Sequence, residues 1–264
     1  MAHMYNSEKM PGAAFFSDTF RNLLRGKDDG LQKGFAAGAK TEKALLDQCF
    51  MGMPSWCKTP VQTINYASCH DGYTLFDKLT LSSPESSFEE RVKMNNLSAA
   101  FTLLSQGVPF FQAGEEMLRS KKNPDGSLEH NSYNCPDSVN SIKWDDLIIP
   151  EYKSTFEYYK GLIRFRKAHR ALRMQNAADV YSHITVMGGL EEGLAAYHIW
   201  GNVNDESAEA IYVVFNSCHE EKELTLPVGK WKVCVADGKA GTETLFIAEE
   251  KITIAPISTL VMIK

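Results

Sequence analysis

The chain has 264 residues, of which 44% are hydrophobic and 23% are charged. This composition is ordinary for a globular protein and excludes a disordered or collagen-like chain. With 28 Lys and Arg against 33 Asp and Glu, the formal net charge is −5. We therefore expect no nucleic-acid partner, because phosphate binding needs a basic patch. We expect no membrane partner either, because no run approaches the roughly 18 apolar residues of a membrane-spanning helix.

The start of the chain and its cysteines indicate the cellular context. Residues 1–4 resemble the remnant of a tag, and the first ten residues hold no apolar stretch of the kind found in a secretory signal. The six cysteines and seven histidines show no spacing typical of a metal site or a disulfide scaffold. We expect reduced thiols, no metal and no cofactor. Reduced thiols and the lack of a signal favour the cytoplasm. The location nevertheless stays open, since the native N-terminus is expected to lie further upstream.

The first part of the chain is predicted to form three units, each with a short apolar strand and a helix. The strands are predicted at 12–16, 63–69 and 108–112, and the helices at 18–25, 86–105 and 154–169. Ser86 and Ser87 each stand three residues before a glutamate, the capping-box pattern of a helix start. The stretch 26–60 is expected to be irregular. A polar loop follows at 119–144, and loops of this length are usually functional or disordered.

The pattern changes near residue 173. Short alternating strands separated by turns are predicted at 180–187, 194–200, 210–215, 223–226, 230–236, 251–254 and 259–263. Strands at this spacing are typical of an antiparallel β-sandwich, and we expect it to bury a core of its own. An α/β portion over 5–174 thus precedes an all-β domain over 175–264. Three strands are too few for a barrel of about 250 residues, so the α/β portion is a small open layer or the last part of a barrel.

The strongest local candidate for chemistry begins at Tyr66 and contains His70 and Asp71. Both follow a predicted buried strand, and the carboxyl ends of parallel strands carry binding and catalysis. A carboxylate there can accept hydrogen bonds from substrate hydroxyls, an imidazole can donate them, and Tyr66, Tyr73 and Phe76 offer flat surfaces for sugar rings. A structural interpretation carries equal weight, in which Asp71 caps the next turn and His70 bonds to the backbone.

Polar residues also follow the third predicted strand. Glu115 and Glu116 lie at its end, where an acidic residue more often caps the next segment or pairs with an arginine such as Arg119 than takes part in catalysis. The loop beyond is polar enough to line a cleft. Alternatively, it is a solvated excursion tied down by Tyr133 and Trp144.

Several segments together resemble one enzyme family. They are KMPGAAFFSDTFRNLLRG at 9–26, the motif over 66–79, LLSQGVPFFQAGEEMLRSK at 103–121, and NSYNCPDSVN at 131–140 followed by IKW at 142–144. In this order they are similar to strand six with its helix, the motif after strand seven, strand eight, and the loop after it in type I pullulanases. These debranching enzymes of the α-amylase superfamily hydrolyse α-1,6-glucosidic bonds. The resemblance implies the last three βα units of a (β/α)8 barrel, strands six to eight, followed by an antiparallel β-sandwich.

The resemblance also implies roles for individual residues. Asp71 matches the family's third catalytic carboxylate, which stabilises the transition state, and His70 matches its sugar-hydroxyl partner. Further contacts to substrate are expected from Tyr66, Tyr73, Glu115, Arg119, Asn131, Tyr133, Asn134, Asp137 and Asn140. The nucleophile and general acid of this retaining mechanism belong to Gly-Phe-Arg-Phe-Asp and Gly-Glu-Gly-Trp strings, neither of which occurs here. We therefore expect the C-terminal portion of a pullulanase, inactive alone.

One departure from the family pattern affects the expected substrate. Gly72 follows Asp71 where many type I pullulanases have Asn, and the His-Asp-Gly-Tyr-Thr-Leu string is closer to isoamylases and glycogen-debranching relatives. The partner is expected to be a branched α-glucan or a maltooligosaccharide, with pullulan, starch and glycogen types left open. Two alternatives remain: a non-catalytic glycan-binding or scaffolding protein, and one half of a split debranching enzyme. An incomplete barrel would also favour self-association.

Overall fold

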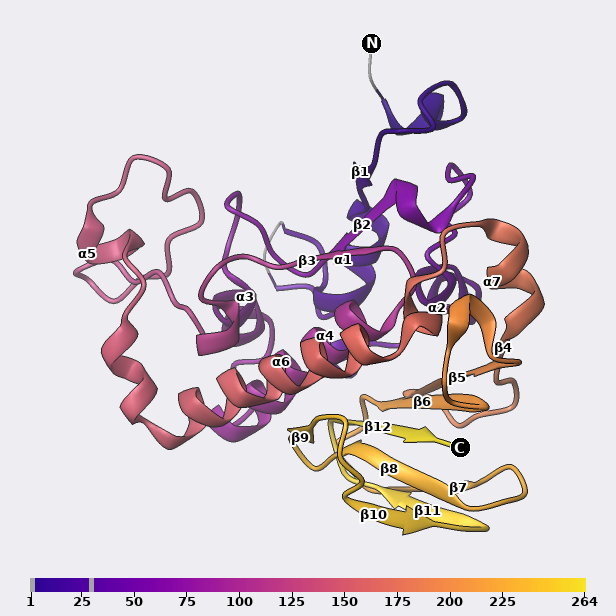
Figure 1. Ribbon diagram of the computed structural model, residues 1–264. Coiled ribbons are helices and arrows are strands. Elements are labelled where there is room, and N and C mark those ends of the chain that lie inside the picture. Colours follow the sequence, from indigo (N-terminus) through magenta and orange to yellow (C-terminus); the bar gives the residue numbers. More distant parts are fainter. Residues whose placement is uncertain (1–2, 29–30) are drawn as a thin grey trace.

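The computed structural model describes residues 3–28 and 31–264, and Figure 1 shows how its elements are arranged. After a 3₁₀ turn, η1 (Met4–Lys9), the first strands are β1 (Phe15–Phe16), β2 (Thr63–Tyr66) and β3 (Val108–Phe110). They form a parallel sheet in the order β1-β2-β3. The sheet agrees with the three predicted strands, each of them shorter than expected. Because β2 is central, the residues that follow it lie between the turns that follow β1 and β3.

Helices lie between and after these strands. The α-helices are α1 (Asp18–Arg25), α2 (Lys43–Met51), α3 (Leu75–Ser82), α4 (Phe88–Leu104), α5 (Asp137–Asn140) and α6 (Pro150–Ala168). The 3₁₀ turns are η2 (Phe35–Ala37), η3 (Pro60–Gln62), η4 (Glu115–Met117), η5 (Trp144–Ile148) and η6 (Arg170–Arg173). The predicted capping box is confirmed at α4: the Ser87 hydroxyl accepts from the backbone N–H of Glu90, whose carboxylate accepts from that of Ser87.

Besides α5, a single turn within the predicted loop, two helices of the α/β portion lie outside the sequence-based prediction. One is α2, within the stretch expected to be irregular. The other, α3, begins after Thr74, whose hydroxyl accepts from the backbone N–H of Asp77 at 3.1 Å. Thr74 and Asp77 have the spacing of Ser87 and Glu90, so the sequence does hold a helix-start signal for α3.

The C-terminal portion is built from antiparallel strands. They are β4 (Ile184–Val186), β5 (Leu194–Trp200), β6 (Ala210–Asn216), β7 (Lys222–Thr225), β8 (Trp231–Ala236), β9 (Lys239–Ala240), β10 (Phe246–Ala248), β11 (Lys251–Ile254) and β12 (Ser258–Ile263). The larger sheet has the order β10-β8-β12-β6-β5-β4, with β9 paired to β8, and β11 pairs with β7 in a second sheet. A further 3₁₀ turn, η7 (Val203–Asp205), joins β5 to β6.

The predicted strand over 180–187 is partly wrong. Residues Ala177–His183 form helix α7, and only Ile184–Val186 are extended as β4. The Asn176 side chain starts the helix by accepting from the backbone N–H of Asp179 at 2.8 Å. A side-chain cap of this kind stabilises a helix start by about 1 kcal/mol, which favours a helix before the β4 strand.

The larger sheet buries apolar side chains on both faces. One face packs on the small sheet around residues such as Trp231, Leu224 and Met262. The other face packs on the helices: the rings of Phe101 in α4 and Phe215 in β6 are centred 5.0 Å apart. Figure 1 shows α4 and α6 between the parallel sheet and the larger antiparallel sheet. One apolar cluster therefore runs from α1 to β12, across the predicted boundary at residue 174.

A buried arginine adds polar contacts to this layer. The guanidinium of Arg166 in α6 donates to the carbonyl oxygens of Leu103 at 2.8 Å, Ser105 at 2.9 Å and Gly107 at 2.8 Å. These carbonyls belong to the end of α4 and the segment after it, where backbone acceptors lack helical partners. Arg166 thus fixes α6 against the end of α4.

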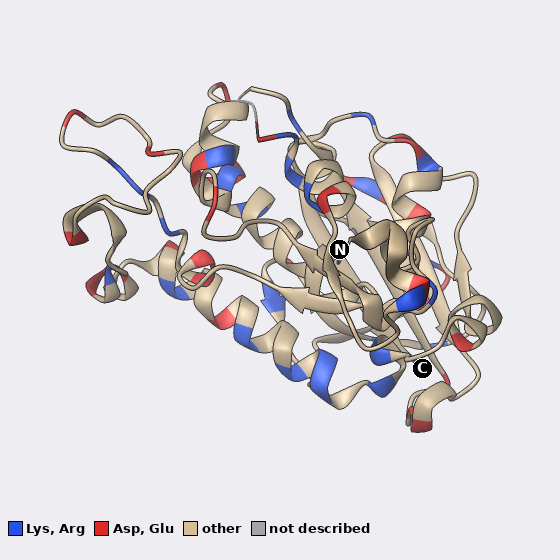
Figure 2. Ribbon diagram, turned by 90° about the horizontal axis from the view of Figure 1, so that it is seen from above, with Lys and Arg blue, Asp and Glu red and all other residues tan. Residues whose placement is uncertain are grey.

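Charged residues of both signs are distributed over helices and loops (Figure 2). Over residues 3–28 and 31–264, no helix combines the length and the apolar character that crossing a bilayer would require.

Candidate functional site

His70 and Asp71 lie just beyond β2 and point their side chains into solvent. The Asp71 side chain is 78% exposed and that of His70 is 85% exposed, with Nε2 of His70 3.3 Å from Oδ1 of Asp71. A carboxylate acceptor and an imidazole therefore stand side by side at the carboxyl end of the central parallel strand. The structure brings together the two residues expected to carry the chemistry and leaves both accessible.

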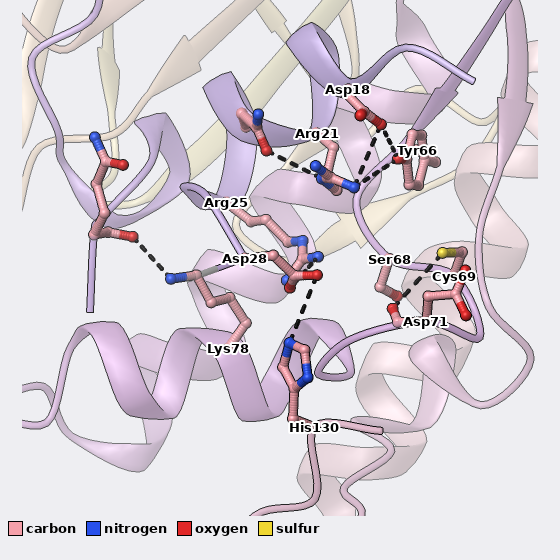
Figure 3. A network of polar contacts seen from close by, with 12 residues as sticks. Asp18, Arg21, Arg25, Asp28, Tyr66, Ser68, Cys69, Asp71, Lys78 and His130 are labelled. Carbon is pink, nitrogen blue, oxygen red and sulfur yellow. Dashed lines mark hydrogen bonds and ion pairs between the residues drawn. The ribbon is translucent and has the colours of Figure 1, made fainter. Parts of the chain in front are cut away.

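The turn after Asp71 is shaped by a glycine. Gly72 has φ +73°, and a Cβ there would lie 2.4 Å from Oδ2 of Asp28. Asp28 is held in turn by Arg25, whose Nη2 donates to Oδ1 at 3.0 Å (Figure 3). Glycine is the residue that fits both the left-handed backbone and the neighbouring carboxylate. The glycine at position 72, which departs from the expected sequence pattern, therefore fits the space that the Asp28 carboxylate leaves.

Tyr66 was expected to contact sugar, but its side chain is buried. The residue is 3% exposed, and its hydroxyl donates to Oδ1 of Asp18 at 2.6 Å and accepts from Nη1 of Arg21 at 2.9 Å. Burial, followed by the hydrogen bond to Asp18, raises the pKa of Tyr66. The ring packs edge-on against Phe16, so Tyr66 joins β2 to β1 and α1 and offers no platform to a ligand.

Glu115 is also buried, against the expectation of a substrate contact. It is 5% exposed, and its two oxygens accept from Ser68 Oγ at 2.6 Å and from the Tyr159 hydroxyl at 3.0 Å. Burial raises the pKa of Glu115 to about 7, although both hydroxyls favour the charged form. The carboxyl therefore presents almost no surface to a sugar.

Arg119 and Asn140 fix the shape of the loop after β3. Nη1 of Arg119 donates to the Ala113 carbonyl at 2.8 Å, and Nη2 donates to the carbonyl of Asn140. The Asn140 amide donates to the carbonyls of Ser132 at 2.6 Å and Cys135 at 3.0 Å. Both side chains are thus engaged within the loop.

Of the other expected contacts, Tyr73 is half-buried and the remaining four are exposed. They are Asn131, Tyr133, Asn134 and Asp137, on a loop that projects from the body around α5 (Figure 1). The loop approaches the Asp71 turn at His130, whose ring is centred 4.7 Å from that of Tyr73 and whose Nε2 lies 3.8 Å from Oδ2 of Asp28. Across the described part of the chain, no hydrogen bond joins Asp71 to residues 131–140.

A buried aspartate fixes the base of this loop and has no place in the sequence-based prediction. Asp77 in α3 is 1% exposed and accepts from the Ser120 hydroxyl and from the backbone N–H of Lys121, the latter at 2.8 Å. Burial raises its pKa. The spacing from Thr74 to Asp77 could have placed it at a helix start, but the contact with Ser120 depends on the fold.

No metal centre is visible in the described ranges, which contain no group of three or more His, Cys, Asp or Glu side chains arranged to hold an ion. All six cysteines are free thiols.

Comparisons with known proteins identify pullulanases as relatives of this chain. A family model described as "Pullulanase, all-beta domain" matches residues 180–239. The chain is 32% identical over 233 residues to the pullulanase of Bacillus subtilis (strain 168), covering 86% of this chain and 31% of that protein. It thus spans under a third of the length of this curated relative.

The solved pullulanase from Bacillus acidopullulyticus superposes with a TM-score of 0.89 at 32% identity, covering 96% of this chain and 30% of that one. Pullulanase type I from Bacillus subtilis str. 168, solved with maltose, superposes with a TM-score of 0.90 at 28% identity, covering 99% and 37%.

Proposed function

Since the chain belongs to the pullulanase family and corresponds to the C-terminal part of its members, we propose that it supplies one side of a debranching active site. The reaction is hydrolysis of α-1,6-glucosidic bonds in branched glucans such as pullulan, starch or glycogen. The observation that carries the proposal is the exposed pair of His70 and Asp71 at the carboxyl end of β2. That edge of a parallel sheet is where βα structures hold their reacting groups.

The architecture supports a partial (β/α)8 barrel. Strands β1, β2 and β3 are parallel and neighbour one another in chain order, as successive strands of such a barrel do. We propose that they are strands six to eight. Both outer strands of this sheet have one edge free of a strand partner within the described residues, where a barrel would continue.

Asp71 has the chemistry of a transition-state stabiliser. A carboxylate accepts hydrogen bonds from sugar hydroxyls, and these strengthen as the ring flattens toward an oxocarbenium ion. His70, 3.3 Å away, donates to a neighbouring hydroxyl of the same sugar. The nucleophile and general acid of a retaining mechanism would come from the two strings that the 264 residues do not contain. The chain alone is therefore expected to hydrolyse no glucan.

The exposed side chains of the loop would extend this site. Asn131 and Asn134 carry amides, Asp137 a carboxylate and Tyr133 an 81% exposed ring, and such groups bind maltooligosaccharides through hydrogen bonds and stacking. Arg119 and Asn140 hold the loop in shape.

Two measurements test the proposal. The first is release of reducing ends from pullulan by the isolated chain, which should not exceed that of a blank. Release above the blank would contradict the expectation that the chain is inactive on its own. The second is a titration with maltotriose followed by amide NMR. We expect shifts at residues 69–73 and 131–137 that Asp71→Asn diminishes and Asp47→Asn, on α2, does not. Shifts confined to 175–264 would instead support a glycan-binding sandwich and overturn the proposed site.

A further inference from the structure

A buried polar cluster lies directly behind the turn that carries Asp71. At its centre is Glu115, the first residue of η4 after β3. Its Oε2 accepts from Ser68 Oγ at 2.6 Å and its Oε1 from the Tyr159 hydroxyl at 3.0 Å. The Nδ2 of Asn95 in α4 lies 3.3 Å from the Tyr159 oxygen. Ser68, Asn95 and Tyr159 are each at most 1% exposed, so the cluster lies within the protein interior.

Ser68 links this cluster to the candidate site. It stands between the end of β2 and the turn, two residues before His70 and three before Asp71. A short hydrogen bond to a group on the β3 side therefore restrains the backbone from which both exposed side chains project. The exposed turn has few other anchors of this kind: the Asp71 carbonyl accepts a weak bond from the Cys69 thiol at 3.7 Å, and Gly72 packs on Asp28.

We propose that Glu115 is a positioning residue, whose carboxyl holds Ser68 and through it the turn bearing His70 and Asp71. The inference rests on the proposed function, because it gives that turn its importance. It replaces the substrate contact expected for Glu115 with an action through a second residue.

The protonation state of Glu115 determines how Ser68 is held. When the carboxyl is ionised, each oxygen accepts from one hydroxyl, which matches the two observed contacts. When it is protonated, one oxygen carries a hydrogen and becomes a donor, which weakens or reverses its hydrogen bond with Ser68 or Tyr159. Burial raises the pKa of Glu115 to about 7, so this exchange falls near neutral pH.

Other charged groups around the cluster act in known directions. Arg25 in α1, which is 1% exposed, favours the ionised form of Glu115, and the neighbouring Glu116 disfavours it. The Glu116 carboxylate accepts from the backbone N–H of Gly114 at 2.9 Å, a contact within the same turn and away from Ser68. Glu116 is therefore a matched control: the same residue type, one position along, with no bond to Ser68.

Amide NMR on this chain between pH 5.5 and 8.5 tests the proposal without any glucan. All variants are made in a His70→Gln, His130→Gln background, so that neither imidazole beside the turn contributes to its amide shifts. We expect the amides of Cys69, Asp71 and Gly72 to shift with a midpoint near pH 7. Glu115→Gln should abolish the step, whereas Glu116→Gln should keep it with at most a small change in midpoint.

A second variant distinguishes positioning from general stability. Ser68→Ala keeps Glu115 and Tyr159. The amide shift of Glu115 should therefore still change with pH, while the amide shifts of the turn no longer change with it. A turn that shows no step where the Glu115 amide shift shows one, or that keeps its step in Glu115→Gln or Ser68→Ala, would overturn the proposal. The maltotriose titration is independent: its failure with the pH step intact would reject the glucan site and leave the link between Glu115 and the turn.

Discussion

Nδ1 of His169 lies 2.9 Å from Oε1 of Glu206, and their side chains are only 8% and 2% exposed. The same carboxylate accepts from the backbone N–H groups of Ala208 at 3.0 Å and Ala171 at 3.1 Å. Burial favours the neutral acid, yet these hydrogen bonds outweigh it and lower the pKa of Glu206 to about 2. Because His169 ends α6 and Glu206 follows η7, the pair joins the α/β portion to the all-β portion.

The pair predicts a loss of stability in acid. A carboxyl whose pKa falls from its ordinary 4.5 to about 2 on folding stabilises the native state fully above pH 4.5. This stabilisation is lost as the pH falls toward 2 and amounts to at most about 3 kcal/mol. Urea unfolding of Glu206→Gln at pH 7 should show a lower free energy of unfolding and a flatter dependence on pH between 5 and 2.5. Glu209→Gln, 69% exposed beside Lys264, should unfold as the parent does; equal losses in both variants would refute the assignment.

The sequence predicts local structure better than contacts between elements. The α1 bounds and the α4 capping box are confirmed because they depend on residues three or four apart. By contrast, the His169–Glu206 pair joins residues 37 positions apart, and no periodicity in either segment indicates that they meet. The missed helix α3 is different, because its Thr74–Asp77 signal is present in the sequence.

Replacing Arg166 should destabilise the whole chain. Arg166→Met would leave three backbone carbonyls, at the end of α4 and in the segment after it, without their donor, and an unsatisfied buried acceptor costs about 1–3 kcal/mol. We expect a decrease in the free energy of unfolding of about 3 kcal/mol or more in a urea titration. Arg164→Met, on the exposed side of the same helix, should change it by less than about 0.5 kcal/mol. Similar values for the two variants would show that the carbonyl contacts contribute little.

A glycine in α6 is predicted to be required by close packing. A Cβ at Gly161 would lie 2.0 Å from the carbonyl oxygen of Ala240 in β9. Gly161→Ala should therefore lower stability by about 1–3 kcal/mol, even though alanine is the better helix former. At Gly188 a Cβ would meet nothing within 4 Å, so Gly188→Ala should be neutral or slightly stabilising. Thermal unfolding of both variants is the measurement, and a stable Gly161→Ala would mean that α6 can move away from β9.

Asp71 can be tested in any active debranching protein that contains this chain. Asp71→Asn should lower kcat by about 100-fold or more, with KM changed only a few-fold, because its hydrogen bonds strengthen in the transition state. Asp47→Asn, at a surface ion pair with Lys43, serves as the control for folding. A rise in KM with kcat intact would show that Asp71 only holds substrate.

The parallel sheet predicts self-association of the isolated chain. Phe16 on β1 is 45% exposed and Val108 on β3 is 40% exposed, and unpaired strand edges and apolar surface both recruit other chains. Light scattering should give a mass that rises with concentration and falls back in Phe16→Ser. Val228→Ser, at a 96% exposed turn of the all-β portion, should not alter it. A monomer at every concentration would contradict the prediction.

Less of the candidate site than of the fold is predictable from the sequence. His70 and Asp71 lie where expected because their position follows from one strand end. Tyr66 and Glu115 lie at strand ends as well, yet they face inward, and the sequence does not show that Asp18 and Ser68 would hold them there. Whether a polar side chain at a strand end reaches solvent depends on its neighbours in space.

The continuous apolar layer around α4 and α6 has a consequence for how the chain opens. Phe101 in α4 touches both Phe50 of α2 and Phe215 of β6, with ring centres 4.9 and 5.0 Å apart. Local opening of either portion would expose the surface that the other covers. Slowly exchanging amides in α4, β6 and β12 should therefore share one opening free energy, as members of a single cooperative unit. A change in composition along the chain, such as the one near residue 173, need not mark a boundary between units that unfold independently.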